Sequence, residues 1–268
     1  MCPDLNIPVF TKDQLIDKLK VIHDMGWIKS ARPGNDGAVG NTLEDLLGIK
    51  ENNLPIANCT EWELKAQRSS TSSLTTLFHM DPSPKGVSIV TSLLLPYYGW
   101  QHQKAGLEYS SNEMSFRSTT SANKYTDRGF IVIVDRTEKK VKFSFNVNKV
   151  DKDKHGAWLN NIENNVGINE LNPQPYWGFS DLMYKAGSKL KNTFFILADQ
   201  KNENGEEYFL YKEVYILANF DFDHFLKCID NGLIVIDFDA RSKHNHGTKY
   251  RIKQNHWPDL YETVEKII

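Results

Sequence analysis

Hydrophobic residues near the start of the chain recur with the spacing of an α-helix. Four apolar side chains share one helical face: Leu15, Ile16, Leu19 and Ile22. Residues one turn apart lie on the same side of a helix, so this stripe is typical of a helix packed on a core. Thr11 and Gln14 form a capping-box pattern ahead of the stripe, and Gly26 suits the end. We predict a structural helix over residues 11–25.

A second helix is expected to end at Gly48. Asn41 suits its N-cap, and Glu44 stands three residues later. Glutamate is favoured at the third helical position for capping alone, so the spacing by itself gives Glu44 no chemical role. Residues 29–40, between the two helices, are rich in glycine but contain no P-loop or dinucleotide fingerprint.

Residues 60–66 alternate between apolar and polar side chains, as a half-buried β-strand does. Successive side chains of a strand project to opposite faces, so Trp62 and Leu64 are expected to face a core. Glu63 and Lys65 then share the other face. The strand therefore presents a carboxylate and an ammonium group side by side.

The rest of the chain mixes short strands and helices. Strands are predicted at residues 129–135, 140–147, 193–198, 207–215 and 233–238. Helices are predicted at residues 180–190 and 221–229, and residues 74–78 form a short extended or helical core piece. Residues 99–128 are polar with little periodicity and are predicted to form long loops or an irregular lobe, and residues 154–175 are again predicted to be loop-like. Because no βαβαβ run is present, we expect an α+β fold with a mixed central sheet.

Composition limits the classes of protein to which this chain can belong. With 268 residues and 12% aromatic residues, it can bury a core as one large domain or two intimate lobes. Three scattered cysteines give no disulfide framework and no zinc spacing, which favours a reducing cytoplasm. We find no signal-peptide pattern at the start. The most apolar stretch, residues 87–98, is shorter than the roughly 20 residues that a membrane helix needs, so we expect no membrane partner.

The formal net charge of −2 means that any nucleic-acid footprint has to be local. No acidic residue occurs from Arg241 to His256, whereas eight basic residues do: Arg241, Lys243, His244, His246, Lys249, Arg251, Lys253 and His256. Arginine can bind guanine with two hydrogen bonds, and lysine commonly meets phosphate. Composition alone leaves a solvated basic loop and a DNA-reading loop equally open. A lone His-x-His lacks the further ligands of a metal site, and it does not make an HNH nuclease.

Glu63 and Lys65 have the chemistry to act on a phosphate ester. A carboxylate supplies the oxygen ligand that Mg²⁺ prefers, and a lysine can activate water or offset negative charge. Glu44 and Asn58 lie upstream, where both can reach the same spot. A bare Glu-x-Lys is nevertheless a weak motif by itself.

Two longer blocks carry a family resemblance. The first contains GNTLEDLLGIKENNL, ELKAQR and TSSLTTLF, and the second is NHGTKYRI at residues 245–252. Together they resemble the MvaI/BcnI family of type II restriction endonucleases, in the PD-(D/E)xK nuclease superfamily with MutH-like enzymes. The resemblance implies a single restriction endonuclease chain over residues 1–268, with two lobes around a DNA cleft. The catalytic lobe is expected mainly within residues 1–100 plus parts of the C-terminal half, and the recognition lobe includes about residues 175–256.

The resemblance also implies roles for individual residues. The expected catalytic residues are Glu44, Asn58, Glu63 and Lys65. Asn58 and Glu63 are expected to hold Mg²⁺, for which Mn²⁺ or Ca²⁺ can substitute. The family has an aspartate where this chain has Asn58, five residues before Glu63, so the amide keeps an oxygen ligand but loses its charge. Either the chain is catalytically impaired, by a natural or a deliberate substitution, or its metal site is completed differently.

The implied partner is double-stranded DNA. The expected contact residues are His79, Arg241, Lys243, His244, His246, Lys249 and Arg251. The implied activity is Mg²⁺-dependent hydrolysis at a short GC-rich pseudo-palindrome of the CC-N-GG kind. A monomer would cut one strand at a time in a bacterial cytoplasm, with a cognate DNA methyltransferase in the same cell. Two alternatives stay open: a sequence-specific DNA-binding protein that has lost catalysis through Asn58, and a MutH-like nicking endonuclease.

Overall fold

The computed structural model describes residues 10–35, 37–49, 62–167 and 170–268. The chain divides into two compact units. Unit 1 comprises residues 1–73, 190–221 and 257–268, and unit 2 comprises residues 74–189 and 222–256. Both units mix helices with β-strands, so the predicted α+β class is confirmed. Within the described residues, no helix is long and apolar enough to span a membrane.

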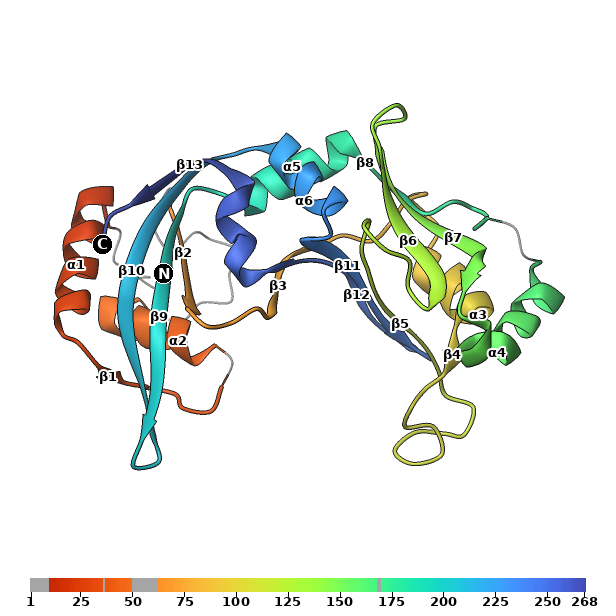
Figure 1. Ribbon diagram of the computed structural model, residues 1–268, viewed down its shortest axis with the longest axis horizontal. Coiled ribbons are helices and arrows are strands. Elements are labelled where there is room, and N and C mark those ends of the chain that lie inside the picture. The colour runs from red at the N-terminus through yellow and green to blue at the C-terminus, as the bar shows by residue number, and fades with distance from the viewer. Residues whose placement is uncertain (1–9, 36, 50–61, 168–169) are drawn as a thin grey trace, which may run out of the picture. The chain divides into compact units, whose positions relative to one another are not determined.

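Unit 1 is built on a mixed sheet. Its elements are α1 (Lys12–Asp24), β1 (Ile28–Lys29), α2 (Ala38–Leu47), β2 (Glu63–Arg68), β9 (Thr193–Glu203), β10 (Glu206–Phe220) and β13 (Tyr261–Lys266). The strands β9 and β10 form a long antiparallel hairpin, and β2 pairs in parallel with β9. The strands β1 and β13 both pair antiparallel with β10. Figure 1 shows α1 and α2 beside this hairpin.

The first helix confirms the prediction from the apolar stripe. Thr11 is its N-cap, and the capping box is complete, because Gln14 N donates to Thr11 Oγ1 and Thr11 N donates to Gln14 Oε1. Its apolar side chains join those of α2 and of the sheet in one buried cluster. Burial of this stripe removes apolar surface from water, which is the main stabilising term for a helix of this length.

The second helix begins earlier than predicted. It starts at Ala38, with Gly37 as N-cap, so Asn41 lies inside the helix and the predicted cap is wrong. Tertiary packing explains the difference, because Ala38 and Val39 are fully buried and extend the helix into the core. The predicted end is confirmed: Gly48 is left-handed with φ of 70°, a conformation that favours glycine.

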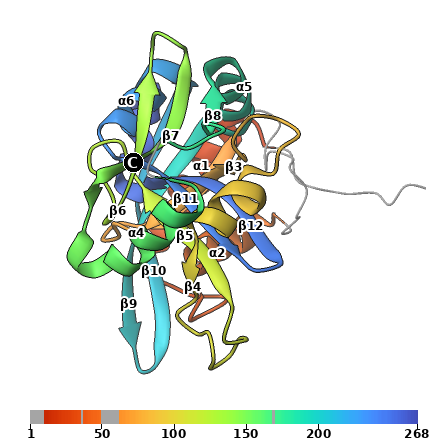
Figure 2. The same ribbon diagram turned by 90° about the vertical axis from the view of Figure 1, so that its right-hand side faces the viewer.

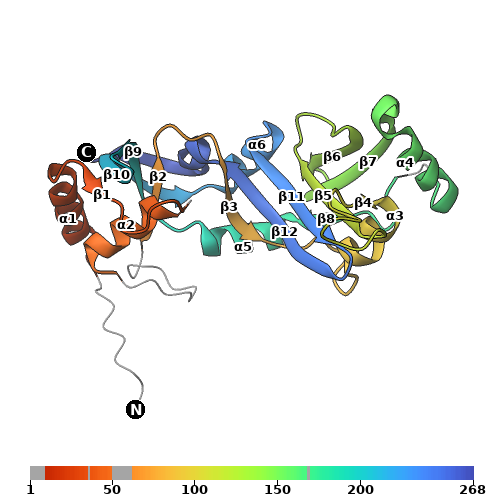
Figure 3. The same ribbon diagram turned by 90° about the horizontal axis from the view of Figure 1, so that it is seen from below.

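Unit 2 contains two antiparallel sheets. Its elements are β3 (Leu74–His79), a π-helical turn η1 (Val90–Leu94), α3 (Leu95–Tyr98), β4 (Trp100–Gln101), β5 (Met114–Thr120), β6 (Arg128–Asp135), β7 (Lys140–Val150), α4 (Lys152–Asn165), β8 (Tyr176–Gly178), α5 (Phe179–Lys189), α6 (Phe222–Asp230), β11 (Ile234–Arg241) and β12 (His244–Lys253). The larger sheet has the order β3-β12-β11-β5-β4, and the smaller has β6-β7-β8. Figure 3 shows β3, β12 and β11 side by side.

Aromatic side chains join the two sheets of unit 2. Phe143 of β7 lies 4.6 Å from Phe238 of β11 between ring centroids, and Phe130 of β6 lies 5.4 Å from Phe116 of β5. All four rings are buried. Aromatic pairs at these separations add packing energy beyond the area they remove from water. The β6–β7 hairpin therefore packs on the larger sheet through these phenylalanines. Figure 2 shows the backbone of this hairpin.

Two predicted loops contain regular structure. Residues 99–128 hold β4 and β5, and residues 154–175 hold most of α4. The strand β5 buries Ser118 and Thr120, whose hydroxyls bond each other at 2.9 Å, so its inward face is not apolar in the sequence. The helix α4 buries only a short stripe that includes Leu159 and Ile162. Both patterns are too weak for a prediction from hydrophobic periodicity.

Candidate functional sites

The strand β2 places Glu63 and Lys65 on the same face. Leu64, between them, is buried in the cluster with α1 and α2, so its two neighbours project to the opposite side of the sheet. Trp62 packs on Phe194 with ring centroids 5.1 Å apart, on the side of Leu64. The predicted alternation is therefore confirmed for residues 62–66, whereas residues 60 and 61 lie outside the described residues. The strand β2 runs from Glu63 to Arg68.

A tryptophan from the C-terminal segment lies beside Lys65 within unit 1. A 3-10 helix, η2 (Gln254–Leu260), leads into β13 and carries Trp257. Lys65 Nζ lies 5.0 Å from the centroid of the Trp257 ring. Burial lowers the pKa of Lys65, and the charge of Glu63 opposes this shift. The amine is therefore closer to neutrality than an ordinary lysine, which suits a group that takes a proton from water.

Tyr261 adds a protonated hydroxyl to the same face. Its hydroxyl lies 3.2 Å from Thr193 Oγ1, and it donates to the Lys191 carbonyl at 3.2 Å. Thr193 pairs in register with Glu63. Burial raises the pKa of Tyr261 to about 12, so this hydroxyl stays protonated at neutral pH. Its contacts hold the start of β13 against the strand pair that carries Glu63.

Glu44 lies in the last turn of α2 rather than at its third position. The capping explanation for this glutamate therefore does not apply. An acidic side chain near a helix C-terminus is disfavoured by the helix dipole. The helix packs against β2, the strand that carries Glu63 and Lys65. This placement is consistent with a role for Glu44 outside helix stability.

Of the two predicted metal ligands, Glu63 belongs to the described residues. Glu63 supplies the oxygen ligand that a hard divalent cation prefers. Asn58, the other predicted ligand, lies outside the described residues. In the described ranges, we find no group of three or more His, Cys, Asp or Glu side chains placed to hold a metal ion.

The second predicted site lies on a sheet in unit 2. Much of the predicted basic loop is the strand β12, paired with β11 and β3. Every second side chain of β12 points inward and is buried. The side chains between them, together with those of β5 and β11 on the same side, form the other face of the sheet. We call this side the polar face, and it comprises Arg117, Thr119, Asp237, Asp239, Arg241, Lys249 and Arg251.

The basic residues of the polar face are paired with acids from the neighbouring strand. Asp239 accepts from Arg117 Nε at 2.8 Å and lies 3.7 Å from Lys249 Nζ. Asp237 accepts from Arg251 at 3.2 Å and from Thr119 at 2.7 Å. The polar face therefore carries hydrogen-bond acceptors as well as donors. Strand pairing thus brings acidic side chains beside the acid-free segment 241–256.

The remaining predicted contact residues lie around the turn between β11 and β12. Lys243 occupies that turn with φ of 63° and is exposed. The rings of His244 and His246 lie 4.3 Å apart, edge to face. His79 of β3 pairs in register with Lys249. His79 is far from His244 and His246 in the sequence, but the sheet places it on β3, the strand next to β12, which carries those two histidines.

Arg241 has partners outside the β11–β12 hairpin. Its Nη1 lies 3.2 Å from Glu113 Oε1, and its guanidinium lies 4.7 Å from the Tyr109 ring. Glu113 is buried. This acid, like Asp237 and Asp239, was missed from the sequence. The alternation in Asp237-Phe238-Asp239 was the available signal, since a buried aromatic between two acids puts both acids on one face.

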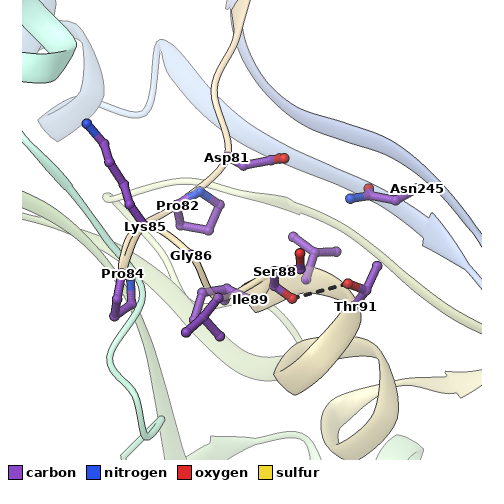
Figure 4. Close-up of a pocket in the computed structure, with 11 residues that line it drawn as sticks. Asp81, Pro82, Pro84, Lys85, Gly86, Ser88, Ile89, Thr91 and Asn245 are labelled. Carbon is purple, nitrogen blue, oxygen red and sulfur yellow. Dashed lines mark hydrogen bonds between the residues drawn. The ribbon is translucent and has the colours of Figure 1, made fainter.

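A pocket of about 350 Å³ adjoins the start of β12. Asp81 and Asn245 line it from one side, and the segment from Pro82 to Thr91 lines the rest (Figure 4). The Asp81 carboxylate also accepts from Thr248 N at 3.0 Å, which ties the segment after β3 to β12. This hydrogen bond ties one wall of the pocket to β12.

The chain thus has two candidate sites, a Glu-x-Lys strand on the mixed sheet of unit 1 and a polar sheet face in unit 2. The characteristic sequence of the MvaI/BcnI restriction endonuclease family matches residues 16–261, and the chain belongs to this family. Members of the family are site-specific deoxyribonucleases. The resemblance inferred from the sequence is thus confirmed.

Solved structures show the same fold. A complex of restriction endonuclease MvaI with its cognate DNA substrate matches with a TM-score of 0.69 and 23% identity, over 97% of this chain and 100% of that chain. Restriction endonuclease MvaI in the absence of DNA matches with a TM-score of 0.57 and 22% identity, over 100% and 99% of the two chains. A comparison with curated proteins gives no match.

Proposed function

We propose that this chain is a type II restriction endonuclease that hydrolyses phosphodiester bonds in double-stranded DNA. Its family membership and its likeness to MvaI, which was solved with a cognate DNA substrate, support DNA as the partner. The observation that carries the proposal is the pair Glu63 and Lys65 on one face of β2, beside Trp257 and Tyr261.

In this proposal, Lys65 orients the attacking water and takes its proton. Its pKa is lowered by burial, which favours the neutral amine that this step requires. Glu63, the Asn58 position and Glu44 hold Mg²⁺. When bound, such an ion stabilises the charge that develops on the phosphate oxygens. Attack is in line on phosphorus, and the leaving oxygen departs on the opposite side.

The polar face of unit 2 is the proposed reader of the DNA sequence. Arginine side chains such as Arg251 can donate twice to guanine O6 and N7. Asp237 and Asp239 can accept from the amino group of cytosine, so both members of a G·C pair have a complementary group. This combination supports a short GC-rich site of the CC-N-GG kind. His79, His244 and His246 are proposed to contact the same site.

The proposed enzyme works as a monomer that cuts one strand at a time. Type II restriction also requires protection of the cell's own sites, so we propose a cognate methyltransferase in the same cell. An endonuclease with this specificity would otherwise cut the genome that encodes it.

Asn58 favours a second candidate function. The amide lacks the charge on which hard cations depend, so a sequence-specific DNA-binding protein without cleavage is the main alternative. A MutH-like nicking enzyme would instead need activation by other repair proteins.

A plasmid digest separates the three candidates. The purified chain is incubated with plasmid DNA that carries many CC-N-GG sites, with Mg²⁺ or with EDTA. Discrete fragments that depend on Mg²⁺, with ends that map to one sequence, support the nuclease. Specific binding without cleavage at every Mg²⁺ concentration supports the binding protein. Nicking only after addition of repair proteins supports the MutH-like enzyme.

A further inference from the structure

A second pocket in unit 2 has no assigned role. It measures about 330 Å³ and is lined by parts of β4, β5, the start of β6 and the start of α4. Its charged lining consists of Arg117, Asp127, Arg128 and Lys154, with His155 beside them. Arg117 pairs with Asp239, and Lys154 Nζ lies 2.9 Å from Asp127 and 3.2 Å from Asp151, so carboxylates compensate these two cations. Arg128 has no ion pair among the described residues, so the pocket favours an anion beside this side chain.

Arg128 is the central feature of this pocket. Its guanidinium carbon lies 3.9 Å from the centroid of the Trp100 ring and 5.5 Å from that of Trp158. The Trp158 ring is itself fixed, since its indole N–H donates to the carbonyls of Tyr98 at 3.2 Å and Gly99 at 3.1 Å. Stacking on two rings leaves the edge of a guanidinium, with its N–H groups, available to a ligand.

The guanidinium of Arg128 has donors but no acceptor. Among the described residues it makes neither a hydrogen bond nor an ion pair, and its Nε is buried. An arginine carries five N–H donors, and buried donors without partners are costly. A ligand with several acceptor oxygens would satisfy them. A phosphate provides such oxygens in the geometry that a guanidinium binds in pairs.

The backbone at Arg128 is held rigidly. The register between β6 and β7 shifts just after it, and Gly129 has φ of 75°. A Cβ at Gly129 would lie 2.5 Å from the Asn146 carbonyl oxygen, so only glycine fits this bulge. The stacked arginine is therefore pre-organised, which lowers the entropy lost on binding a ligand.

The pocket also adjoins the polar face. Arg117 and Thr119 line the pocket, and both belong to the polar face, where they bond Asp239 and Asp237. An anion in the pocket would therefore lie next to the groups proposed to read bases. In a duplex, the anions next to the bases are the backbone phosphates.

We infer that this pocket binds a phosphate of the DNA backbone beside the bases that the polar face reads, with Arg128 as its main ligand. The inference rests on the proposed function of the chain as a DNA-binding nuclease. A backbone contact of this kind fixes the register of the protein on the duplex without reading sequence. It would therefore add affinity on every DNA sequence.

The test measures binding of fluorescent duplexes by the full chain with Ca²⁺ in place of Mg²⁺ over a range of salt concentrations. One duplex carries a CC-N-GG site and the other a scrambled sequence. We expect Arg128→Met to weaken binding of both duplexes by about tenfold, as expected for loss of a charge-assisted contact. The slope of log Kd against log salt should fall by about 1, since one phosphate contact is lost.

Arg136→Met is the matched control. Arg136 also belongs to unit 2, but it pairs with Asp230 at 2.6 Å and does not line the pocket. We expect it to leave both the affinity and the salt slope unchanged. Because Arg128→Met removes packing as well as charge, the ring resonances of His155 are followed by NMR in the unaltered chain as well. They are expected to shift on addition of duplex.

The outcomes separate this inference from the proposed function. If the unaltered chain binds DNA but Arg128→Met changes neither affinity nor salt slope, the phosphate site is wrong and the proposed function stands. The phosphate site is also wrong if Arg128→Met weakens binding of the CC-N-GG duplex alone, or if duplex does not shift the His155 resonances. If inorganic phosphate shifts His155 and duplex does not, the pocket serves a free anion instead. If the unaltered chain binds no DNA, both proposals are wrong.

Discussion

Replacing Arg251 by methionine tests whether the ion pairs of the polar face stabilise unit 2. Arg251 Nη1 donates to Asp237 at 3.2 Å, and Nη2 donates to the Leu74 carbonyl at 3.0 Å. These two contacts join β12 to β11 and to β3. The side chains of Arg251 and Asp237 are only 30% and 15% exposed, so solvent screens the pair less than an ordinary surface pair.

The expected loss of unfolding free energy is about 2 kcal/mol. A hydrogen bond to a charged group contributes about 1.5–3 kcal/mol and one to a carbonyl about 1 kcal/mol, and partial exposure reduces both. In the variant, the Asp237 carboxylate still accepts a hydrogen bond from Thr119 at 2.7 Å, so it retains a partner. The loss should therefore stay below the roughly 3–5 kcal/mol of an uncompensated buried charge. It corresponds to a fall in Tm of about 4–8 °C for a unit of this size.

Thermal unfolding followed by circular dichroism measures this effect. Arg136→Met serves as the control, because its pair with Asp230 is 54% and 36% exposed and should contribute about 0–1 kcal/mol. Both variants lose one arginine, so the comparison isolates burial of the pair. A fall in Tm for Arg251→Met no larger than that of the control would refute the reasoning.

Three further predictions concern the metal position Asn58, the surroundings of Lys65 and the pocket that contains Arg128. Asn58→Asp should raise the rate of Mg²⁺-dependent plasmid cleavage by at least roughly 10–100-fold. This is the effect of removing residues that only hydrogen-bond to metal ligands, and a direct ligand should matter no less. An equal or lower cleavage rate contradicts this prediction. Trp257→Leu removes the ring that lies 5.0 Å from Lys65 Nζ and helps to position this amine. Loss of about 1 kcal/mol of positioning energy should slow cleavage about fivefold at unchanged DNA affinity, and an unaltered rate argues against the contact. Burial and the charge of Arg128 lower the pKa of His155, so Arg128→Met should raise it toward its ordinary value in an NMR titration, and a constant pKa contradicts the placement of the two groups.

The parts of the fold that local chemistry determines were predictable. The helix α1 has both a capping box and an apolar stripe, and it lies within one residue of the predicted range. The alternation around Glu63 and Lys65 correctly predicted their shared face. In both cases neighbouring residues carry the whole signal, so no knowledge of distant contacts was needed.

The parts that depend on distant contacts were not predictable. The helix α2 starts at Ala38 because the core of unit 1 covers that residue, and Asn41 is then an interior residue despite its capping preference. The strand β5 buries hydroxyls that bond each other, so its pattern did not resemble a core strand. Propensity alone cannot detect either effect.

The acidic residues of the candidate recognition surface were missed for a similar reason. The segment 241–256 contains no acid, yet Asp237 and Asp239 face it from β11. Pairing of the two strands brings these acids beside Lys249 and Arg251. Counting charges along one segment of the sequence does not include the residues of the neighbouring strand. Which acids lie beside which basic residues can be known only from the register of the sheet.

The central claim is that Glu63 and Lys65 form the catalytic centre of a metal-dependent nuclease. The direct test is a plasmid digest with Mg²⁺ by the unaltered chain, by Lys65→Ala and by Lys212→Ala. Lys212 is an exposed lysine of the same unit, paired with Asp199 at 3.3 Å, and controls for loss of a positive charge. We predict Mg²⁺-dependent fragments with the unaltered chain and with Lys212→Ala, and none with Lys65→Ala. Equal cleavage by all three, or uncut DNA with all three, would contradict the claim.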